Sequence, residues 1–402
     1  MSNLSNDLDR FIMISTDGHA GLPPERYKEY LPSKYHTQFD AELKASVEAR
    51  QNAEKAFLLD EFNQKWRQGI EEELKGAYDS DIRNGVLDSD GVVAEVLFPD
   101  GITEHNSPPF GADLGLKTWN VDPELQWAGA QAHNRWIVDF VKESPDRRIG
   151  LAVVPICYDI PKAVEEIKWA HANGLKGILI PSVWDKYPAY NAQYYYPIWE
   201  ICQELDMVVH THSGPSDEKD MTLPGAVGVF LMEFHWWPAR CIWTMIMGGV
   251  FEFFPKLKLA VTEVGEFWVP SMIHMMDVRA SVKHTSGKLG DFRTHLKMKP
   301  SEYFARNVRI NASALMDKES VDARYDIGVN NMMWGTDYPH PEGTWPKTAS
   351  QMQECFGGVP TDELDRILGL NAIEFYGLNY ERCREIAAKI GPQKTVFNPV
   401  AA

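Results

Sequence analysis

The stretch IGLAVVPICYDIPKAVEEIKWAHANGLKGILIP, residues 149–181, contains two apolar runs separated by a helical pattern. The runs at residues 149–155 and 175–181 are mostly apolar rather than alternating, which is typical of parallel strands covered on both faces. Between them a proline stands near the start of a segment whose apolar residues recur at helical spacing, and Gly174 follows its end. The order strand, helix, strand predicts a βαβ unit.

Runs of the same kind recur along the chain, with stretches of helical character between them. We predict eight strands, at residues 12–17, 92–99, 149–155, 175–181, 207–212, 257–263, 308–311 and 332–337. Eight strands alternating with helices predict an α/β protein with a (β/α)8 TIM barrel. The alternative, a doubly wound sheet, requires a G-x-G-x-x-G phosphate turn after an early strand, and TDGHAG at residues 16–21 lacks that spacing.

The connections between the predicted strands differ in length. A long one follows the first strand, where residues 22–85 include a charged helical pattern. We predict one domain over residues 1–402, in which residues 22–85 form a helical insertion between strands one and two and not an independent domain. Long loops after other strands are expected to lie over the C-terminal mouth of the barrel.

Composition and charge narrow the class of partner. The 402 residues include 40 basic and 57 acidic side chains, which gives a net charge of −17 at pH 7. DNA or RNA is an improbable partner, because its binding requires clustered Lys and Arg, and we find no such cluster. The apolar run at residues 241–251 is about half of the ~20 residues that a membrane helix requires. Five cysteines without a C-x-x-C pair favour a reduced, cytoplasmic protein.

Side chains able to bind a metal stand at the carboxyl ends of four predicted strands, where a barrel places its site. They are Asp17 and His19 on strand one, His210 and His212 on strand five, Glu263 on strand six, and Asp337 on strand eight. Residues i and i+2 of a strand point to one face, so each pair can hold one ion. Each residue alone also fits an ordinary role as a cap or a buried hydrogen-bonding group. Together, these oxygen and nitrogen ligands suit zinc, manganese or iron.

Four segments carry a resemblance to a known family. They are TDGHAG (16–21), ELDMVVHTHSG (204–214), FPKLKLAVTEVGEFWVP (254–270) and WGTDYPHPEGTWP (334–346). In this order they resemble the amidohydrolase-related (amidohydrolase 2) family of metal-dependent barrels, over residues 12–376. The branch it resembles includes aromatic-acid decarboxylases of the aminocarboxymuconate-semialdehyde and resorcylate type.

The resemblance implies roles for the residues at the strand ends. The family's first-strand and eighth-strand motifs fall on Asp17, His19 and Asp337, and its fifth-strand spacing selects His212 as the ligand. His210 is then a residue behind the ligands, a ligand of a second metal, or a buried hydrogen-bonding histidine.

The sixth strand departs from the family pattern. Many members carry a histidine at its end, whereas this sequence has Glu263. A glutamate can bridge two metals, bind one, or serve as a base, but it cannot reproduce the acid-base behaviour of an imidazole near pH 7. We therefore assign catalytic roles to Asp337 and Glu263, and consider Glu263 as a further metal ligand.

The expected function is that of a metal-dependent hydrolase that acts on a small organic substrate through metal-activated water, with zinc or manganese. Three alternatives remain: a non-oxidative decarboxylase of an aromatic or unsaturated acid, a dinuclear iron or iron–manganese oxygenase, and a non-catalytic barrel paired with an active paralogue. We expect a homo-oligomer or a complex with a paralogous subunit. Further candidates for substrate binding are His105, His235, Arg240, His340 and Trp345.

Overall fold

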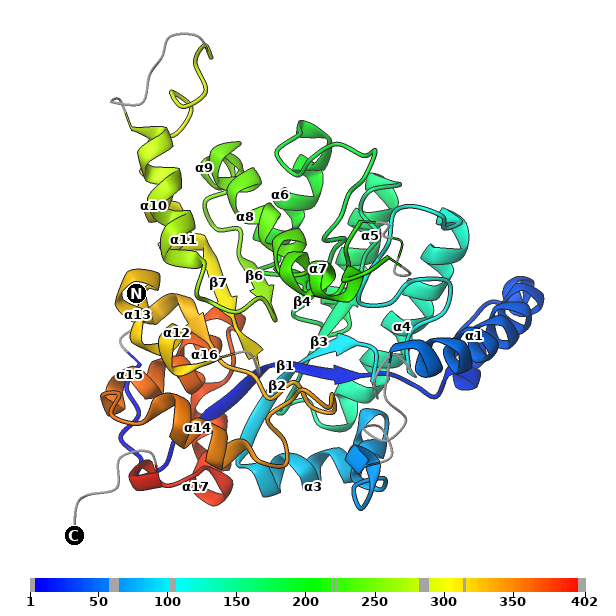
Figure 1. Ribbon diagram of the computed structural model, residues 1–402, viewed down its shortest axis with the longest axis horizontal. Helices are drawn as coiled ribbons and strands as arrows, with labels where there is room; N and C mark the ends of the chain where they lie inside the picture. Colours follow the sequence, from blue (N-terminus) through cyan, green and yellow to red (C-terminus); the bar gives the residue numbers. More distant parts are fainter. Residues whose placement is uncertain are drawn as a thin grey trace.

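The fold is a closed barrel of eight parallel strands in sequence order (Figure 1). The computed structural model describes residues 4–57, 65–101, 106–217, 220, 223–281, 289–313 and 316–396. The strands are β1 (Met13–Ala20), β2 (Val92–Pro99), β3 (Arg148–Val153), β4 (Gly177–Leu179), β5 (Val208–His212), β6 (Leu259–Thr262), β7 (Val308–Asn311) and β8 (Met332–Met333). The predicted (β/α)8 barrel is confirmed.

The last segment of the barrel closes onto the first through the backbone. The amides of Thr16 and His19 donate to the carbonyls of Trp334 and Tyr338, and the amide of Asp337 donates to the carbonyl of Asp17. Regular pairing with β7 ends at Met333, so β8 is shorter than the predicted strand at 332–337. Beyond it, the backbone of residues 334–338 pairs with β1. This backbone pairing brings the predicted site residues of strands one and eight side by side.

Helices follow the strands as the βαβ pattern predicts. Helix α5 (Ile160–Ala172) begins at the cap Asp159, whose carboxylate accepts a hydrogen bond from the amide of Lys162. It ends before Gly174, whose φ of +92° is the left-handed conformation that glycine adopts readily. The other helices between or after the strands are α4 (Pro123–Glu143), α6 (Tyr196–Glu204), α7 (Ala226–Glu233), α8 (Trp236–Met247), α9 (Val250–Phe253), α10 (Val269–Ala280), α11 (Pro300–Asn307), α12 (Lys318–Asp322), α13 (Arg324–Ile327), α14 (Thr348–Phe356), α15 (Thr361–Asp365), α16 (Asn371–Tyr376) and α17 (Tyr380–Ile390).

The connection between β1 and β2 is helical in its described parts. It contains η1 (Pro24–Glu29), η2 (Ser33–Tyr35), α1 (His36–Phe57), η3 (Glu73–Ala77) and α3 (Ser80–Asp90). In Figure 1 the arrowhead of β1 points toward α1. The connection therefore has the helical character expected of residues 22–85, whereas its dependence on the barrel for folding stays a prediction.

The two faces of β5 show how the strand period sorts the core. Val209 packs in an apolar cluster with residues of α8 such as Ile242. Val208, on the other face, packs with Ile14 and other interior residues. His210 and His212 share the face of Val208, because side chains alternate along a strand. Among the described helices, none combines the length and the apolar character that crossing a bilayer would require.

Candidate metal centre

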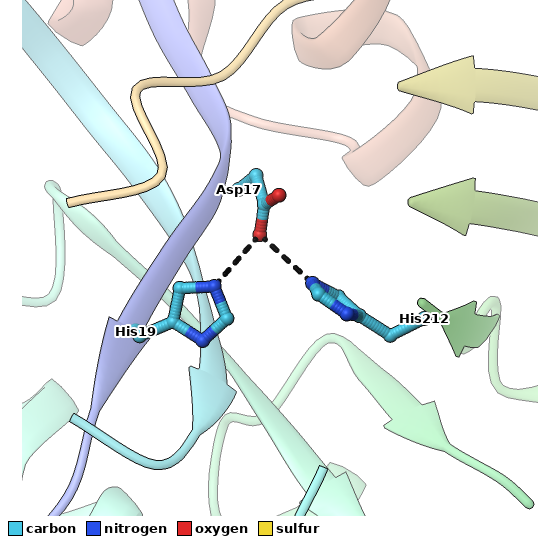
Figure 2. Close-up of side chains that lie close together, drawn as sticks. All are labelled: Asp17, His19 and His212. Carbon is cyan, nitrogen blue, oxygen red and sulfur yellow. Dashed lines mark hydrogen bonds and ion pairs between the residues drawn. The ribbon is translucent and has the colours of Figure 1, made fainter. Parts of the chain in front are cut away.

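Three fully buried side chains from two strands meet at the carboxyl end of the barrel (Figure 2). The Oδ1 atom of Asp17 lies 3.4 Å from Nε2 of His19 and 3.2 Å from Nε2 of His212. Asp17 and His19 are two residues apart on β1, so they reach the same face. One atom from each residue lies within 4.8 Å of the others, a spacing at which one divalent ion can contact all three.

Two further carboxylates extend this cluster from β6 and β8. The Oδ1 atom of Asp337 lies 2.9 Å from Nε2 of His19. An oxygen of Glu263 lies 3.4 Å from Nδ1 of His212 and accepts a 2.7 Å hydrogen bond from the hydroxyl of Ser213. Glu263 is 13% exposed, whereas Asp337 is fully buried. The structure therefore brings together the five residues that we call the mouth cluster: Asp17, His19, His212, Glu263 and Asp337.

The mouth cluster fits a divalent cation on the chemistry of its atoms. Within the described part of the chain, Oδ2 of Asp17 and Oδ2 of Asp337 are buried without a hydrogen-bond donor. An unpaired carboxylate oxygen inside a protein costs free energy unless a cation or a donor compensates it. Carboxylate oxygen and imidazole nitrogen are ligands of zinc, manganese and iron. Asp17, His19, His212 and Asp337 would hold the ion, with Glu263 beside it.

The groups of the cluster shift one another's pKa values in opposite directions. Burial opposes ionisation of Asp17, but the neighbouring His212 and His19 outweigh it, and the pKa of Asp17 falls well below its usual range. Burial likewise opposes protonation of His19, but bonds to Asp17 and Asp337 raise its pKa to about 9. Burial, reinforced by Asp337, raises the pKa of Glu263 to about 8. Opposed shifts within one cleft are typical of functional sites.

Backbone strain marks the same end of the barrel. Glu263 and Asp337 have φ values of 57° and 59°, and Ser313, after β7, has 55°. Residues other than glycine rarely adopt this left-handed region, and such strain concentrates at functional sites. The strained turns set the directions in which the side chains leave the ends of β6 and β8.

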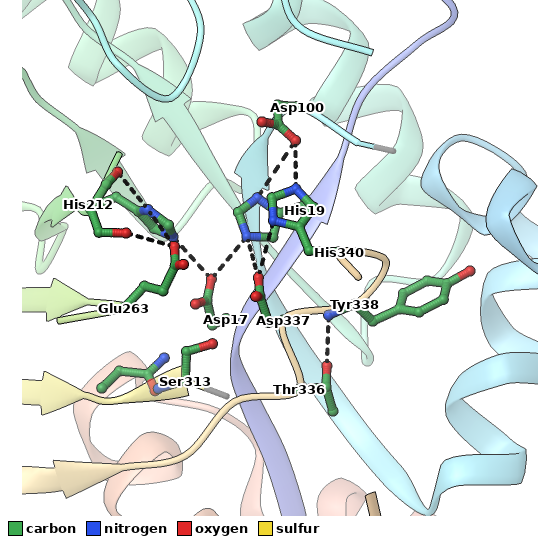
Figure 3. A network of polar contacts seen from close by, with 12 residues as sticks. Asp17, His19, Asp100, His212, Glu263, Ser313, Thr336, Asp337, Tyr338 and His340 are labelled. Atoms are coloured by element: carbon green, nitrogen blue, oxygen red, sulfur yellow. Dashed lines mark hydrogen bonds and ion pairs between the residues drawn. The ribbon is translucent and has the colours of Figure 1, made fainter. Parts of the chain in front are cut away.

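His340 and Asp100 flank the mouth cluster (Figure 3). The ring of His340 stacks on that of His19, with centroids 3.8 Å apart and planes at 19°. One nitrogen of His340 lies 3.4 Å from Oδ1 of Asp337, and the other lies 2.9 Å from Oδ1 of Asp100. His340, predicted as a substrate-binding residue, therefore belongs to the network. Asp100 was missed, although it follows β2 directly, at the type of position that revealed the other residues.

His210 lies apart from the mouth cluster. Its Nε2 bonds with the hydroxyl of Tyr376 at 2.9 Å, and its Nδ1 lies 3.2 Å and 3.1 Å from the carbonyls of Ile178 and Val208. Burial lowers the pKa of His210 to about 3, so its ring is neutral. This geometry corresponds to the buried hydrogen-bonding histidine among the three expectations, and it gives no support to a role for His210 in binding a second metal.

The other predicted substrate-binding residues are spread more widely. His105 lies outside the described residues. His235 is buried against Trp236 and Phe267, and Arg240 stacks on Trp184 and Trp237. Trp345 contacts the ring of Tyr338, next to Asp337. Among the described contacts, none joins His235, Arg240 or Trp345 directly to the mouth cluster.

A buried ion pair beside β1 was also not predicted from the sequence. Arg83 of α3 donates two hydrogen bonds to the carboxylate of Glu95 on β2, at 2.8 Å and 2.6 Å. Its third contact is a 2.6 Å bond from Nη1 to the carbonyl of His19. Both side chains are fully buried. Arg83 therefore holds the backbone of a mouth-cluster residue in place, and the bidentate pair fixes Arg83 itself.

Comparison with known proteins identifies the family. The sequence profile described as amidohydrolase matches residues 118–378. The chain belongs to the amidohydrolase family. It is 28% identical over 263 residues to a 2-amino-3-carboxymuconate-6-semialdehyde decarboxylase of Dictyostelium discoideum, which covers 62% of this chain and 67% of that protein. It is 25% identical over 236 residues to a gamma-resorcylate decarboxylase of a Polaromonas species, which covers 52% and 65%. The chain thus spans about two thirds of these relatives.

Solved structures share the fold over nearly their whole length. The 5-carboxyvanillate decarboxylase of Sphingomonas paucimobilis superposes with a TM-score of 0.65 at 21% identity, covering 91% of this chain and 99% of that one. A dihydroxybenzoic acid decarboxylase of Polaromonas, solved with bound manganese and the inhibitor 2-nitroresorcinol, gives 0.60 at 18%, covering 92% and 98%. At these sequence identities, the structural similarity establishes the fold of this chain and nothing more.

Proposed function

We propose that this protein is a metal-dependent, non-oxidative decarboxylase of a small aromatic or unsaturated acid. The observation that carries the proposal is the convergence of Asp17, His19, His212 and Asp337 at the barrel mouth in a chain whose sequence relatives are decarboxylases. Those relatives favour the decarboxylase alternative over our first expectation, a hydrolase.

A divalent ion at this site would supply a Lewis acid that binds and orients an oxygen of the substrate. Manganese is supported by a solved relative that contains it. The four ligands offer two carboxylates and two imidazoles, a set that zinc and iron also accept. Manganese is therefore the first metal to test.

The residues of the chain supply the proton that decarboxylation requires. The bond between the ring carbon and the carboxylate carbon breaks, carbon dioxide leaves, and the ring carbon takes up a proton in its place. We assign this transfer to Glu263. The assignment is supported by its exposure, the largest in the cluster, and by the bond from Ser213, which occupies Oε2 and leaves Oε1 for the substrate. Its Oε1 would give the proton to the substrate and recover one from water.

Glu263→Gln tests this assignment. The amide keeps the size of the side chain but carries no transferable proton, so we expect the bound metal to remain and turnover to fall by about 100-fold or more. The purified chain is loaded with Mn²⁺ and assayed by chromatography on 2,6-dihydroxybenzoate, an aromatic monoacid, with metal content measured by mass spectrometry. In heavy water the product should carry one deuterium at the carbon that lost the carboxylate.

The control is Glu165→Gln, which removes an exposed carboxylate paired with Lys168 on α5. It should match the wild type in metal content and rate. Near-normal turnover in Glu263→Gln would remove Glu263 from the proton transfer. Hydrolysis products without carbon dioxide, or two ions per chain with oxygen consumption, would replace the decarboxylase proposal with the hydrolase or the oxygenase alternative.

A further inference from the structure

A cavity of about 500 Å³ lies between α1 and the loops that follow β2 and β5. Its apolar wall includes Phe39 and Leu43 from α1, Pro108 and Pro109 from the loop after β2, and Pro215 from the loop after β5. Apolar side chains that line a cavity in this way suit an aromatic ring. The helical connection between β1 and β2 therefore contributes one side of the cavity.

The cavity borders the candidate metal centre at Asp100. This residue lines the cavity and also lies 2.9 Å from Nε2 of His340, which stacks on His19 (Figure 3). On the other side, the lining residue Gly214 is two positions beyond His212. Asp100 and Gly214 therefore place the cavity next to the mouth cluster, on the side where the far end of a bound substrate would lie.

The polar lining of the cavity consists mainly of hydrogen-bond acceptors. Glu42, Asp100 and Asp113 are carboxylates, and Lys117 is the single cation among the described lining residues. Glu42 accepts hydrogen bonds from the amide of Phe110 at 2.8 Å and 3.0 Å, and Asp113 accepts one from Gly115 at 2.9 Å. Within the described ranges, neither Glu42 nor Asp113 forms an ion pair with Lys or Arg.

The burial of these carboxylates shifts their pKa values. Burial raises the pKa of Glu42 to about 7, and the nearby Asp113 reinforces the shift. Burial likewise raises the pKa of Asp113. These raised pKa values mean that the space disfavours negative charge, so a second carboxylate on the substrate would also lose binding free energy there. A hydroxyl or ammonium group would instead find carboxyl oxygens already held in place by backbone amides.

We propose that this cavity receives the part of the substrate remote from the reacting carboxylate and selects aromatic monoacids that carry a hydrogen-bond donor over aromatic diacids. The selection deepens the proposed function and rests on it for the position of the reacting carboxylate. Glu42 and Asp113 are the residues that determine the specificity.

The test compares two ligands that differ only at the remote position. The Mn²⁺-loaded full chain is titrated calorimetrically with 5-(aminomethyl)-2-hydroxybenzoate and with 5-carboxy-2-hydroxybenzoate. We expect the aminomethyl compound to bind at least about tenfold more tightly. In Glu42→Gln combined with Asp113→Asn, the two affinities should come within about twofold, and Glu42→Gln alone should fall between.

Glu165→Gln, which removes an exposed carboxylate away from the cavity, should keep the wild-type preference. Equal affinities in the wild type, tighter binding of the diacid, an absence of binding by both ligands, or a preference unchanged in a folded double variant would each overturn the proposal. Binding does not require turnover. A clear preference without decarboxylation would therefore refute the proposed function and leave the cavity as a selective binding site without the assigned reacting carboxylate.

Discussion

Strand β5 carries two histidines, two residues apart, in successive layers of the barrel interior. The two side chains are equally buried but have different partners and opposite pKa shifts. His212, in the mouth cluster, and His210, one layer deeper, are both fully buried. His212 faces Asp17 and Glu263, which overcome burial and raise its pKa. His210 faces a hydroxyl and two carbonyls, and burial lowers its pKa to about 3. Burial alone therefore does not mark a functional histidine; carboxylate partners do.

The largest expected effect comes from removing the upper histidine. His212→Ala deletes one of four proposed ligands, so we expect the affinity for Mn²⁺ to fall by about 100-fold or more and turnover to be lost. Metal titration followed by calorimetry measures the first effect, and circular dichroism checks the fold. A variant that retains the full affinity would place His212 outside the metal site and would remove the contrast between the layers.

His210→Ala is the matched variant in the deeper layer. We expect it to keep its metal, because His210 does not contact the mouth cluster, but to lose stability by about 1–3 kcal/mol, because the hydroxyl of Tyr376 loses a buried partner. Urea unfolding monitored by fluorescence measures the change. Loss of metal in a well-folded His210→Ala protein would show that the deeper layer also belongs to the site.

A smaller effect concerns Asp90, a half-buried carboxylate at the end of α3 and outside both layers. Burial raises the pKa of Asp90 from 3.8 to about 6, although the hydroxyl of Thr348 donates a 2.8 Å bond to it. The folded state then binds this proton more tightly than the unfolded chain, so the wild type loses stability as the pH rises from about 4 to 6 and stays less stable above.

Asp90→Asn removes this titration. We expect a gain in the free energy of unfolding of about 1–2 kcal/mol at pH 8 that disappears below pH 4, with unchanged metal content and turnover. Unfolding curves at both pH values provide the measurement. A change in metal binding would mean that Asp90 is coupled to the mouth, and equal gains at both pH values would rule out titration as the cause.

The residues of the mouth cluster were predictable because the two-residue period of a strand and the positions of the strand ends can be read from the sequence. Asp17 and His19 share a face through the two-residue period of a strand, and so do His210 and His212. The end of each parallel strand lies at the same mouth, so Glu263 and Asp337 were expected beside them. The predicted end of β8 was less accurate. Residues after Met333 pair with β1 and no longer with β7, and this change of partner depends on how the barrel closes.

Asp100 and Arg83 could not be assigned their contacts from the sequence. Asp100 meets His340 across 240 positions of the chain, and Arg83 meets the carbonyl of His19 across 64. No local pattern links residues so far apart, because such contacts depend on how β2, α3 and the segment after β8 pack. The same holds for the cavity beneath α1, which several loops build together.

The amino-acid sequence by itself determined the eight-stranded barrel and the identity of the mouth cluster, because hydrophobic periodicity and strand-end chemistry are local properties. Only the tertiary structure decided which histidine of β5 meets carboxylates and which meets Tyr376. Alternation gives both residues the same face, and a pKa depends on the three-dimensional neighbours of a group rather than on its position in the chain.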